Sequence, residues 1–160
     1  MGEDMTLPCG EGLVSVRVGA IIMREGRLLL AGNDNSDYLY TVGGRVKIGE
    51  NAEEAVVREV SEETGIRLET DRLYAVHENY FYGDAPSNMD RLIYEIAFFF
   101  LMKTPADFAP VSMSFAEGDS REHIEWVYPD TEKNIYPAFF RKLDLTDKSV
   151  KHYVTDERRN

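Results

Sequence analysis

The chain of 160 residues lacks the features that mark secreted, membrane-spanning and nucleic-acid-binding proteins. Cys9 is the only cysteine, so an intramolecular disulfide cannot form, which fits a reducing compartment. There is no apolar run of about 18 residues and no basic-then-apolar N-terminal signal. Basic residues are scarce, and 18 of them against 29 acidic residues give a net charge of -11. We therefore expect a cytoplasmic protein with neither a nucleic-acid polymer nor a membrane as its partner, because such a surface repels phosphate backbones and anionic lipids.

Repeats, low-complexity tracts and Pro/Gly-rich linkers are also absent, so we expect a single domain over residues 1–160. The segments 1–10 and 146–160 are expected to be irregular or frayed tails. Extended runs predict strands at 13–23, 27–32, 37–42, 66–82, 91–103 and 123–128. Helices are predicted at 52–64 and from Asp130 or Thr131 through Leu143, although Pro137 argues against a regular start to the second helix. This order predicts an α+β fold, an α/β/α sandwich with a mixed sheet between two helical layers.

The segment 52–64 has clear signals for both of its ends. Asn51 is a suitable N-cap that forms a capping box with Glu54, and Gly65 can adopt the left-handed conformation that ends a helix. At about 100° per residue, the small residues Ala52, Ala55 and Val56 fall on one face. That face is therefore expected to pack against the body of the protein.

Three glutamates, Glu59, Glu62 and Glu63, fall on the same face in the last two turns. The negative end of the helix dipole disfavours acidic side chains there, and Glu59 and Glu63 repel each other at a spacing of four residues. Carboxylates turned inward must be protonated, paired or bound to a metal, and Arg58 alone cannot neutralise all three. Hard oxygen ligands suit Mg²⁺, with Mn²⁺ as the alternative, so a divalent cation is the simplest explanation.

The run "GGRVKIGENAEEAVVREVSEETGI" at 43–66 resembles the Nudix box of the Nudix (MutT-like) hydrolase family. The residues at all nine fixed positions of that pattern are Gly44, Glu50, Arg58, Glu59, Val60, Glu62, Glu63, Gly65 and Ile66. The box covers about a seventh of the chain. The strand order around it and the ending "EWVYPDTEKN" also resemble the α/β/α sandwich of that family.

The resemblance implies roles for individual residues of the box. Glu59, Glu62 and Glu63 would bind the metal together with the carbonyl of Gly43. Glu50 would lie near the metal or brace the turn between loop and helix. Arg58 would orient the glutamates through charge-assisted hydrogen bonds. We therefore expect Arg58, Glu59, Glu62 and Glu63 to serve catalysis.

The reaction implied by the resemblance is hydrolysis of the diphosphate linkage in a nucleoside diphosphate linked to another group, NDP-X. A cation would let a small phosphorylated nucleotide approach this acidic protein, and water would attack at phosphorus. A general base must accept the proton of that water. The candidates before the last strand are Glu117, Glu122 and Glu125, of which we favour Glu122. Many members of the family are dimers, so a homodimer is an expectation of the same kind.

Residues outside the box are expected to select the substrate, and their roles remain open. Tyr40, Arg45 and Tyr80 are candidates for substrate binding, by stacking on a base or contacting a phosphate. The wider set contains Tyr38, Tyr82, Phe115, Tyr136, Arg24 and Arg91, and His77 and Asn79 lie on a strand near a plausible pocket. The alternative function is a Nudix-fold nucleotide sensor or regulatory module without turnover. Such members usually lose box glutamates, and none is lost here.

Overall fold

The computed structural model describes residues 2–112 and 121–159. Its strands are β1 (Thr6–Cys9), β2 (Gly12–Ile21), β3 (Met23–Arg24), β4 (Arg27–Asn33), β5 (Tyr38–Arg45), β6 (Thr70–Tyr82), β7 (Leu92–Met102), β8 (Glu122–Val127), β9 (Asn134–Tyr136) and β10 (Lys151–Asp156). The α-helix of this described part is α1 (Ala52–Thr64), and the 3₁₀ helices are η2 (Ala138–Lys142) and η3 (Glu157–Arg159). No helix in these residues is long and apolar enough to cross a membrane.

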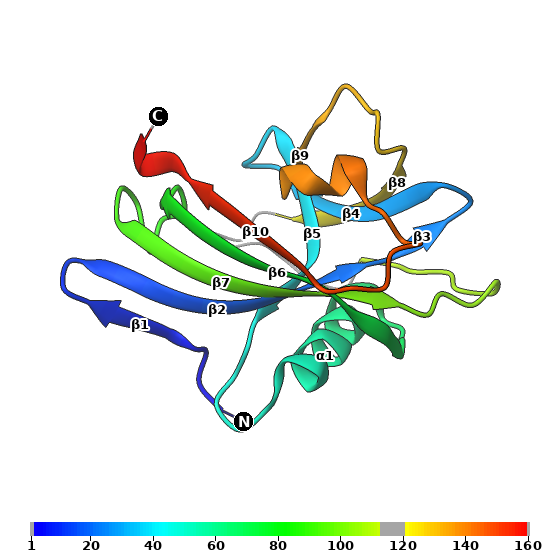
Figure 1. Ribbon diagram of the computed structural model, residues 1–160, viewed down its shortest axis with the longest axis horizontal. Coiled ribbons are helices and arrows are strands. Elements are labelled where there is room, and N and C mark those ends of the chain that lie inside the picture. Colours follow the sequence, from blue (N-terminus) through cyan, green and yellow to red (C-terminus); the bar gives the residue numbers. More distant parts are fainter. Residues whose placement is uncertain (1, 113–120, 160) are drawn as a thin grey trace.

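The strands form a mixed sheet in the order β10-β6-β7-β2-β5-β4-β3 (Figure 1). Three further strands extend it, because β1 pairs with β2, β8 with β4 and β9 with β5. The pairs β10–β6, β2–β7 and β5–β9 are parallel, and the other pairs are antiparallel. Strand β5 is central because its C-terminal half pairs with β2 and its N-terminal half with β4 and β9.

Both faces of the sheet bury apolar side chains, and α1 and η2 lie on opposite sides of it (Figure 1). On the α1 side, Ala55, Val56 and Val60 of the helix are fully buried against the sheet. On the η2 side, Phe140 packs with Leu39 and Tyr74 in a second apolar cluster. The small face predicted for the helix therefore packs inward, and the α+β fold class is confirmed.

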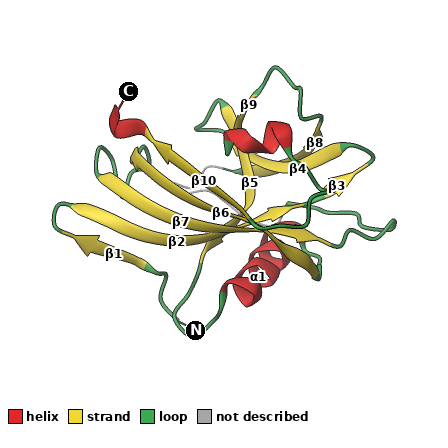
Figure 2. Ribbon diagram, in the orientation of Figure 1, coloured by secondary structure: helices red, strands yellow, loops and turns green. Residues whose placement is uncertain are grey.

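The prediction of a second helix from Asp130 or Thr131 through Leu143 is wrong for most of this segment. Its first part forms β9, which pairs with β5, and only η2 is helical (Figure 2). Pro137 has extended backbone angles and directly precedes η2. Proline cannot donate the backbone hydrogen bond that a helix interior requires, so a helix cannot run unbroken through Pro137, and η2 begins directly after it.

The two segments expected to be irregular tails contain strands instead. At the N-terminus, β1 pairs antiparallel with β2, and at the C-terminus β10 pairs with six residues of β6. In β10, half-buried Lys151 and Tyr153 alternate with exposed His152 and Val154, so burial does not follow apolar character in this strand. The fold places β10 at the edge of the sheet, where its outward face stays solvated, so charged residues are tolerated there.

Candidate active site

Helix α1 is fixed at both ends by local hydrogen bonds. The backbone N–H of Glu54 donates to Oδ1 of Asn51 at 2.8 Å, and the N–H of Asn51 donates to the Glu54 carboxylate at 3.2 Å. Gly65 has φ of 76°, and its N–H donates to the carbonyl of Ser61. The predicted capping box and glycine stop are therefore confirmed, and they hold the acidic end of the helix in place.

Arg58 connects the helix to the loop before it. Its Nε and Nη2 donate to the two Glu50 oxygens at 3.0 and 2.6 Å, and Nη2 also donates to the carbonyl of Arg45 at 3.0 Å. Its Nη1 donates to Glu59 at 2.9 Å and to Glu62 at 3.2 Å. A guanidinium with this many partners is held rigidly. Glu50 therefore braces the turn, while Arg58 orients two box glutamates at once.

Strand β5 approaches α1 closely at its two glycines. The N–H of Gly43 donates to Oε2 of Glu63 at 2.7 Å, and the Glu63 residue is only 7% exposed. A Cβ atom at Gly44 would overlap the carboxylate of Glu59. Glycine at position 44 therefore allows the backbone of β5 to lie directly against the acidic helix end, whereas a Cβ atom at Gly43 would overlap the backbone of Val18 in β2.

Glu122 brings a further carboxylate to this place from the other part of the sheet. It begins β8, is 8% exposed and lies close enough to Glu63 to act on its ionisation. The hydroxyl of Tyr40 donates to Oε2 of Glu122 at 2.7 Å, and Nδ2 of Asn33 donates to the Tyr40 oxygen at 3.1 Å. Two strands thus orient Glu122 toward the helix. We call Glu59, Glu63 and Glu122 the carboxylate cluster.

The carboxylate cluster contains more negative charge than its protein partners compensate. Burial, followed by the charges of Glu122 and Glu59, raises the pKa of Glu63 well above its ordinary value. Burial also raises the pKa of Glu59, although Arg58 opposes this shift. By contrast, the hydrogen bonds from Arg58 lower the pKa of Glu50. Arg58 therefore compensates the charge of Glu50 more fully than that of Glu59 or Glu63. The carboxylate cluster is left with negative charge that a further cation could balance.

The donor set of the cluster fits a hard divalent cation. Its side-chain groups are carboxylates, which suit Mg²⁺ and Mn²⁺. Within residues 2–112 and 121–159, however, no three acidic, histidine or cysteine side chains already converge on a common metal position. Binding an ion there would require rotation of these side chains. The charge imbalance, rather than a preformed geometry, is what supports a cation.

Glu62 differs from the inward orientation expected for all three box glutamates. Its side chain is 49% exposed, compared with 15% for Glu59. Successive helical residues are about 100° apart, so Glu62 lies at the rim of the face that centres near Glu63. Its carboxylate bonds to Arg58 at this rim, and it can reach the cluster only from the solvent side.

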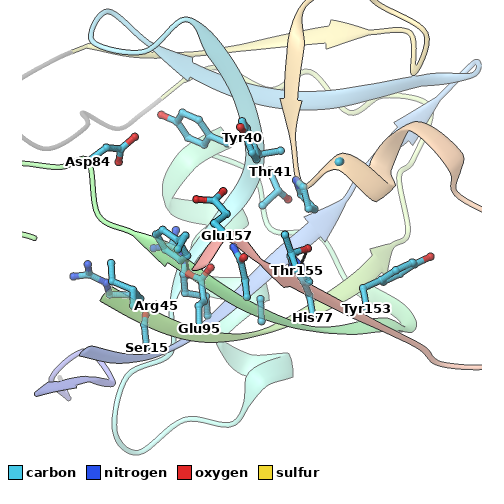
Figure 3. A pocket seen from close by; sticks show the side chains of 18 of the residues that line it. Ser15, Tyr40, Thr41, Arg45, His77, Asp84, Glu95, Tyr153, Thr155 and Glu157 are labelled. Atoms are coloured by element: carbon cyan, nitrogen blue, oxygen red, sulfur yellow. Dashed lines mark hydrogen bonds and ion pairs between the residues drawn. The ribbon is translucent and has the colours of Figure 1, made fainter. Parts of the chain in front are cut away.

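A cavity of about 650 Å³ is lined by Tyr40 among other residues (Figure 3). The hydroxyl of Tyr40 donates to Glu122, so this residue connects the cavity with the carboxylate cluster. The cavity lies between the strands β10, β6, β7 and β2 on one side and β5, β9 and η2 on the other. Tyr40 and Arg45, two of the substrate-binding candidates, line it. Tyr80 is outside the lining and packs instead beneath the guanidinium of Arg158, 3.7 Å from the ring centre.

The remaining candidates divide between the cavity and other surroundings. Tyr38, Tyr82, Tyr136, His77 and Asn79 line the cavity. Arg24 donates to the carbonyl of Phe108 and Arg91 to carbonyls near β2, and neither lines the cavity. Glu125 is paired with Lys133 at 2.8 Å. Glu117 and Phe115 lie outside the described residues.

Sequence reasoning missed the polar residues on the floor of the cavity. Ser15 and Thr155 line it, and so does Glu95 (Figure 3). A signal was present, because Glu95 is a lone acid inside the apolar run "LIYEIAFFFLM". Ser15 and Arg17 likewise alternate with valines in β2. A charged side chain on a buried strand indicates a partner or a site.

Comparisons with known proteins agree with this arrangement. The NUDIX domain family matches residues 14–147. A MutT-like protein of Streptomyces ambofaciens is 43% identical over 68 residues, which make up 42% of this chain and only 44% of that protein. A MutT NUDIX hydrolase of Burkholderia pseudomallei has a similar structure, with a TM-score of 0.60 and 27% identity over 80% of this chain and 95% of that chain.

A mutator MutT protein of Bacillus halodurans has a TM-score of 0.63 over 88% of this chain and 90% of that chain. Its 18% identity shows the shared fold alone. The family match covers most of the chain and includes the whole glutamate-bearing helix. The resemblance read from residues 43–66 is thereby confirmed, and the chain belongs to the NUDIX family.

Proposed function

We propose that this protein is a pyrophosphohydrolase that cleaves the diphosphate linkage of NDP-X substrates. The observation that carries the proposal is the carboxylate cluster of Glu59, Glu63 and Glu122, buried beside a cavity and short of positive charge. A cation would supply the positive charge that this cluster lacks and would allow a negatively charged diphosphate to approach it.

Glu59, Glu62, Glu63 and the carbonyl of Gly43 would hold Mg²⁺, or Mn²⁺ in its place. Bound there, the cation would stabilise charge on the phosphoryl group and lower the pKa of a water molecule. Arg58 keeps Glu59 and Glu62 oriented through its hydrogen bonds. Glu50 is a positioning residue, because both its oxygens are occupied by Arg58.

Glu122 is the group we propose as general base. It is buried, lies beside Glu63 and is oriented by the Tyr40 hydroxyl. A base must be held within hydrogen-bond reach of the attacking water, and this fixed carboxylate supports that role. Glu125 is a weaker candidate because Lys133 and His123 already pair with it.

The cavity would hold the nucleoside or the X group, since Tyr40 joins it to the cluster. Its aromatic residues and its two arginines, Arg17 and Arg45, suit a small phosphorylated nucleotide. We also propose a cytoplasmic location, with which the free, exposed Cys9 is consistent.

The test is release of phosphate or nucleotide from a panel of NDP-X compounds with and without Mg²⁺. We expect metal-dependent turnover that falls at least about a hundredfold in Glu63→Gln, because a ligand and its charge are lost. Glu132→Gln is the matched control, since Glu132 is exposed and lies outside the cavity and the cluster. Tight binding of one compound without any turnover would instead favour the sensor function.

A further inference from the structure

A row of polar side chains crosses the cavity floor on four neighbouring strands. Strand pairing places Ser15 of β2 opposite Glu95 of β7, and Glu95 opposite Asn79 of β6. Asn79 is in turn opposite Thr155 of β10. Directly paired residues point to the same face of a sheet, and all four line the cavity (Figure 3). We call these four residues the polar row.

Glu95 is the charged member of the polar row. Its side chain is 16% exposed, and Nε of Arg17 lies 3.1 Å from its Oε1 atom. Burial raises the pKa of Glu95, and the charges of Arg17 and Arg45 oppose this shift. Among the described residues, Arg17 is the one that contacts this carboxylate. Its second oxygen is therefore left as a hydrogen-bond acceptor at the cavity floor.

Asn79 adds a second unsatisfied group beside Glu95. Its Oδ1 atom is buried and has no hydrogen-bond partner among the described residues. A buried acceptor without a donor destabilises a protein, and a ligand that supplies the donor removes this penalty. The amide also carries N–H donors next to its oxygen. The floor thus combines an acceptor-only carboxylate with an amide that can both accept and donate.

The position and the walls of the cavity suit a planar ring. Gly19 of β2 pairs with Gly43, whose N–H donates to Glu63 of the carboxylate cluster, and Ser15 lies four residues before Gly19 on the same strand. At about 3.3 Å per residue, the polar row lies about 13 Å from the diphosphate end, which leaves space for a sugar and a base. Tyr38 and Tyr136 line the cavity and can stack on the face of such a ring.

The charges around the cavity favour a ligand rich in N–H donors. Asp84 and Glu157 line it together with Glu95, and both are acceptors when ionised (Figure 3). The two arginines of the lining lie opposite each other on β2 and β5, on the side of the polar row nearer the cluster. The far end of the cavity is therefore the acceptor-rich end.

We propose that Glu95, held by Arg17 and assisted by Asn79, selects nucleotides whose base presents two adjacent N–H donors, as guanine does with its ring N–H and its 2-amino group. A carboxylate accepts both donors side by side, and the buried Oδ1 of Asn79 can accept the remaining N–H of the amino group. Adenine and cytosine place an acceptor next to their amino group, and uracil flanks its single N–H with carbonyl oxygens. Each would set a lone pair against the carboxylate. This inference rests on the proposed function, because it assumes that the cavity holds the nucleoside.

Binding of GMP, IMP, AMP and UMP, measured by calorimetry with Mg²⁺, tests the proposal without requiring turnover. We expect GMP to bind at least about tenfold more tightly than AMP or UMP, because each good bidentate pair discriminates by that order. IMP lacks the 2-amino group and should bind several-fold more weakly than GMP. Glu95→Gln should remove most of the difference between GMP and IMP, because an amide cannot accept from both donors.

Asn79→Ala provides a second variant should Glu95→Gln fail to fold. It should weaken GMP binding several-fold with little effect on AMP binding. Glu78→Gln is the matched control on β6, since Glu78 lies outside the cavity lining and bonds to Tyr94 and His152. Equal binding of GMP, IMP and AMP, or an unchanged preference in the folded variants, would overturn the assignment. A guanine preference without hydrolysis of any NDP-X would overturn the proposed function alone, and hydrolysis without a base preference would overturn this inference alone.

Discussion

The carboxylate cluster and the floor of the cavity both bury acidic side chains, but their charges are balanced differently. In the cluster, Glu59 shares Arg58 with Glu50 and Glu62, and Glu63 has a single backbone donor from Gly43. On the floor, Glu95 has Arg17 as a counter-ion. Burying an acid therefore does not by itself identify its role, because the number of positive partners decides what the acid can bind. The carboxylate cluster can therefore bind a cation, and the cavity floor can accept hydrogen bonds from a ligand.

The largest expected difference between the carboxylate cluster and the cavity floor is the increase in the free energy of unfolding that Mg²⁺ causes. A ligand that binds only the native state at a hundred times its dissociation constant adds about 2.7 kcal/mol to the free energy of unfolding. We expect an increase of this order in the wild type and in Glu95→Gln, and almost none in Glu63→Gln. Urea unfolding with and without Mg²⁺ measures it. An equal increase in all three proteins would show that the ion binds elsewhere.

The same experiment without Mg²⁺ provides a control on the charge argument. Glu63→Gln should be more stable than the wild type by about 1 kcal/mol, because it removes repulsion with Glu59 and Glu122. Glu95→Gln should gain less than Glu63→Gln, because the charges of Arg17 and Arg45 offset part of the burial penalty on Glu95. A larger gain in Glu95→Gln than in Glu63→Gln would contradict the comparison.

The residues of the carboxylate cluster and those of the polar row also differ in how well the sequence predicts them. The helix signals of Asn51, Glu54 and Gly65 are local, and the box glutamates follow within a few residues, so both were found by spacing. The polar row unites four strands that are far apart in the chain, and it depends on strand register. No local pattern gives register between β2 and β7, or places β10 beside β6. The orientation of Glu62 at the rim also required knowing how α1 is rotated against the sheet.

In the cavity wall, His77 shows that burial also disfavours a positively charged side chain. Burial lowers the pKa of His77 to about 4, and its Nε2 lies 2.8 Å from the Thr155 hydroxyl. The unfolded chain has a histidine pKa of about 6.5, so between pH 6.5 and 4 the unfolded state binds more protons. The stabilisation from keeping His77 neutral is therefore complete above about pH 6.5 and is lost as the pH falls toward 4.

The full shift corresponds to about 3 kcal/mol, which screening from the cavity that the ring lines reduces to about 2 kcal/mol. Urea unfolding at several pH values should show this loss in the wild type. His77→Phe keeps a ring against Phe139 and should flatten the curve over that range. His152→Phe is the control, because His152 is exposed and outside the cavity. A slope that persists in His77→Phe would assign the pH dependence to other groups.

Tyr40 joins the two places, and its hydroxyl is the contact that can be removed most cleanly. It lines the cavity with its ring and donates to Glu122, while Asn33 donates to it. Tyr40→Phe keeps the ring and removes the hydroxyl that donates to Glu122. We expect kcat to fall at least about tenfold, since one hydrogen bond to a charged group contributes about 1.5–3 kcal/mol, while KM changes less than about twofold.

Tyr38→Phe is the matched control, because its hydroxyl donates to Asp84 at 3.3 Å and does not contact the cluster. It should leave kcat unchanged, and any effect should appear in KM through the cavity wall. Steady-state kinetics on one NDP-X substrate therefore distinguish a residue that positions Glu122 from one that only lines the cavity. A rise in KM alone for Tyr40→Phe would show that Tyr40 acts only through the cavity wall and does not position Glu122.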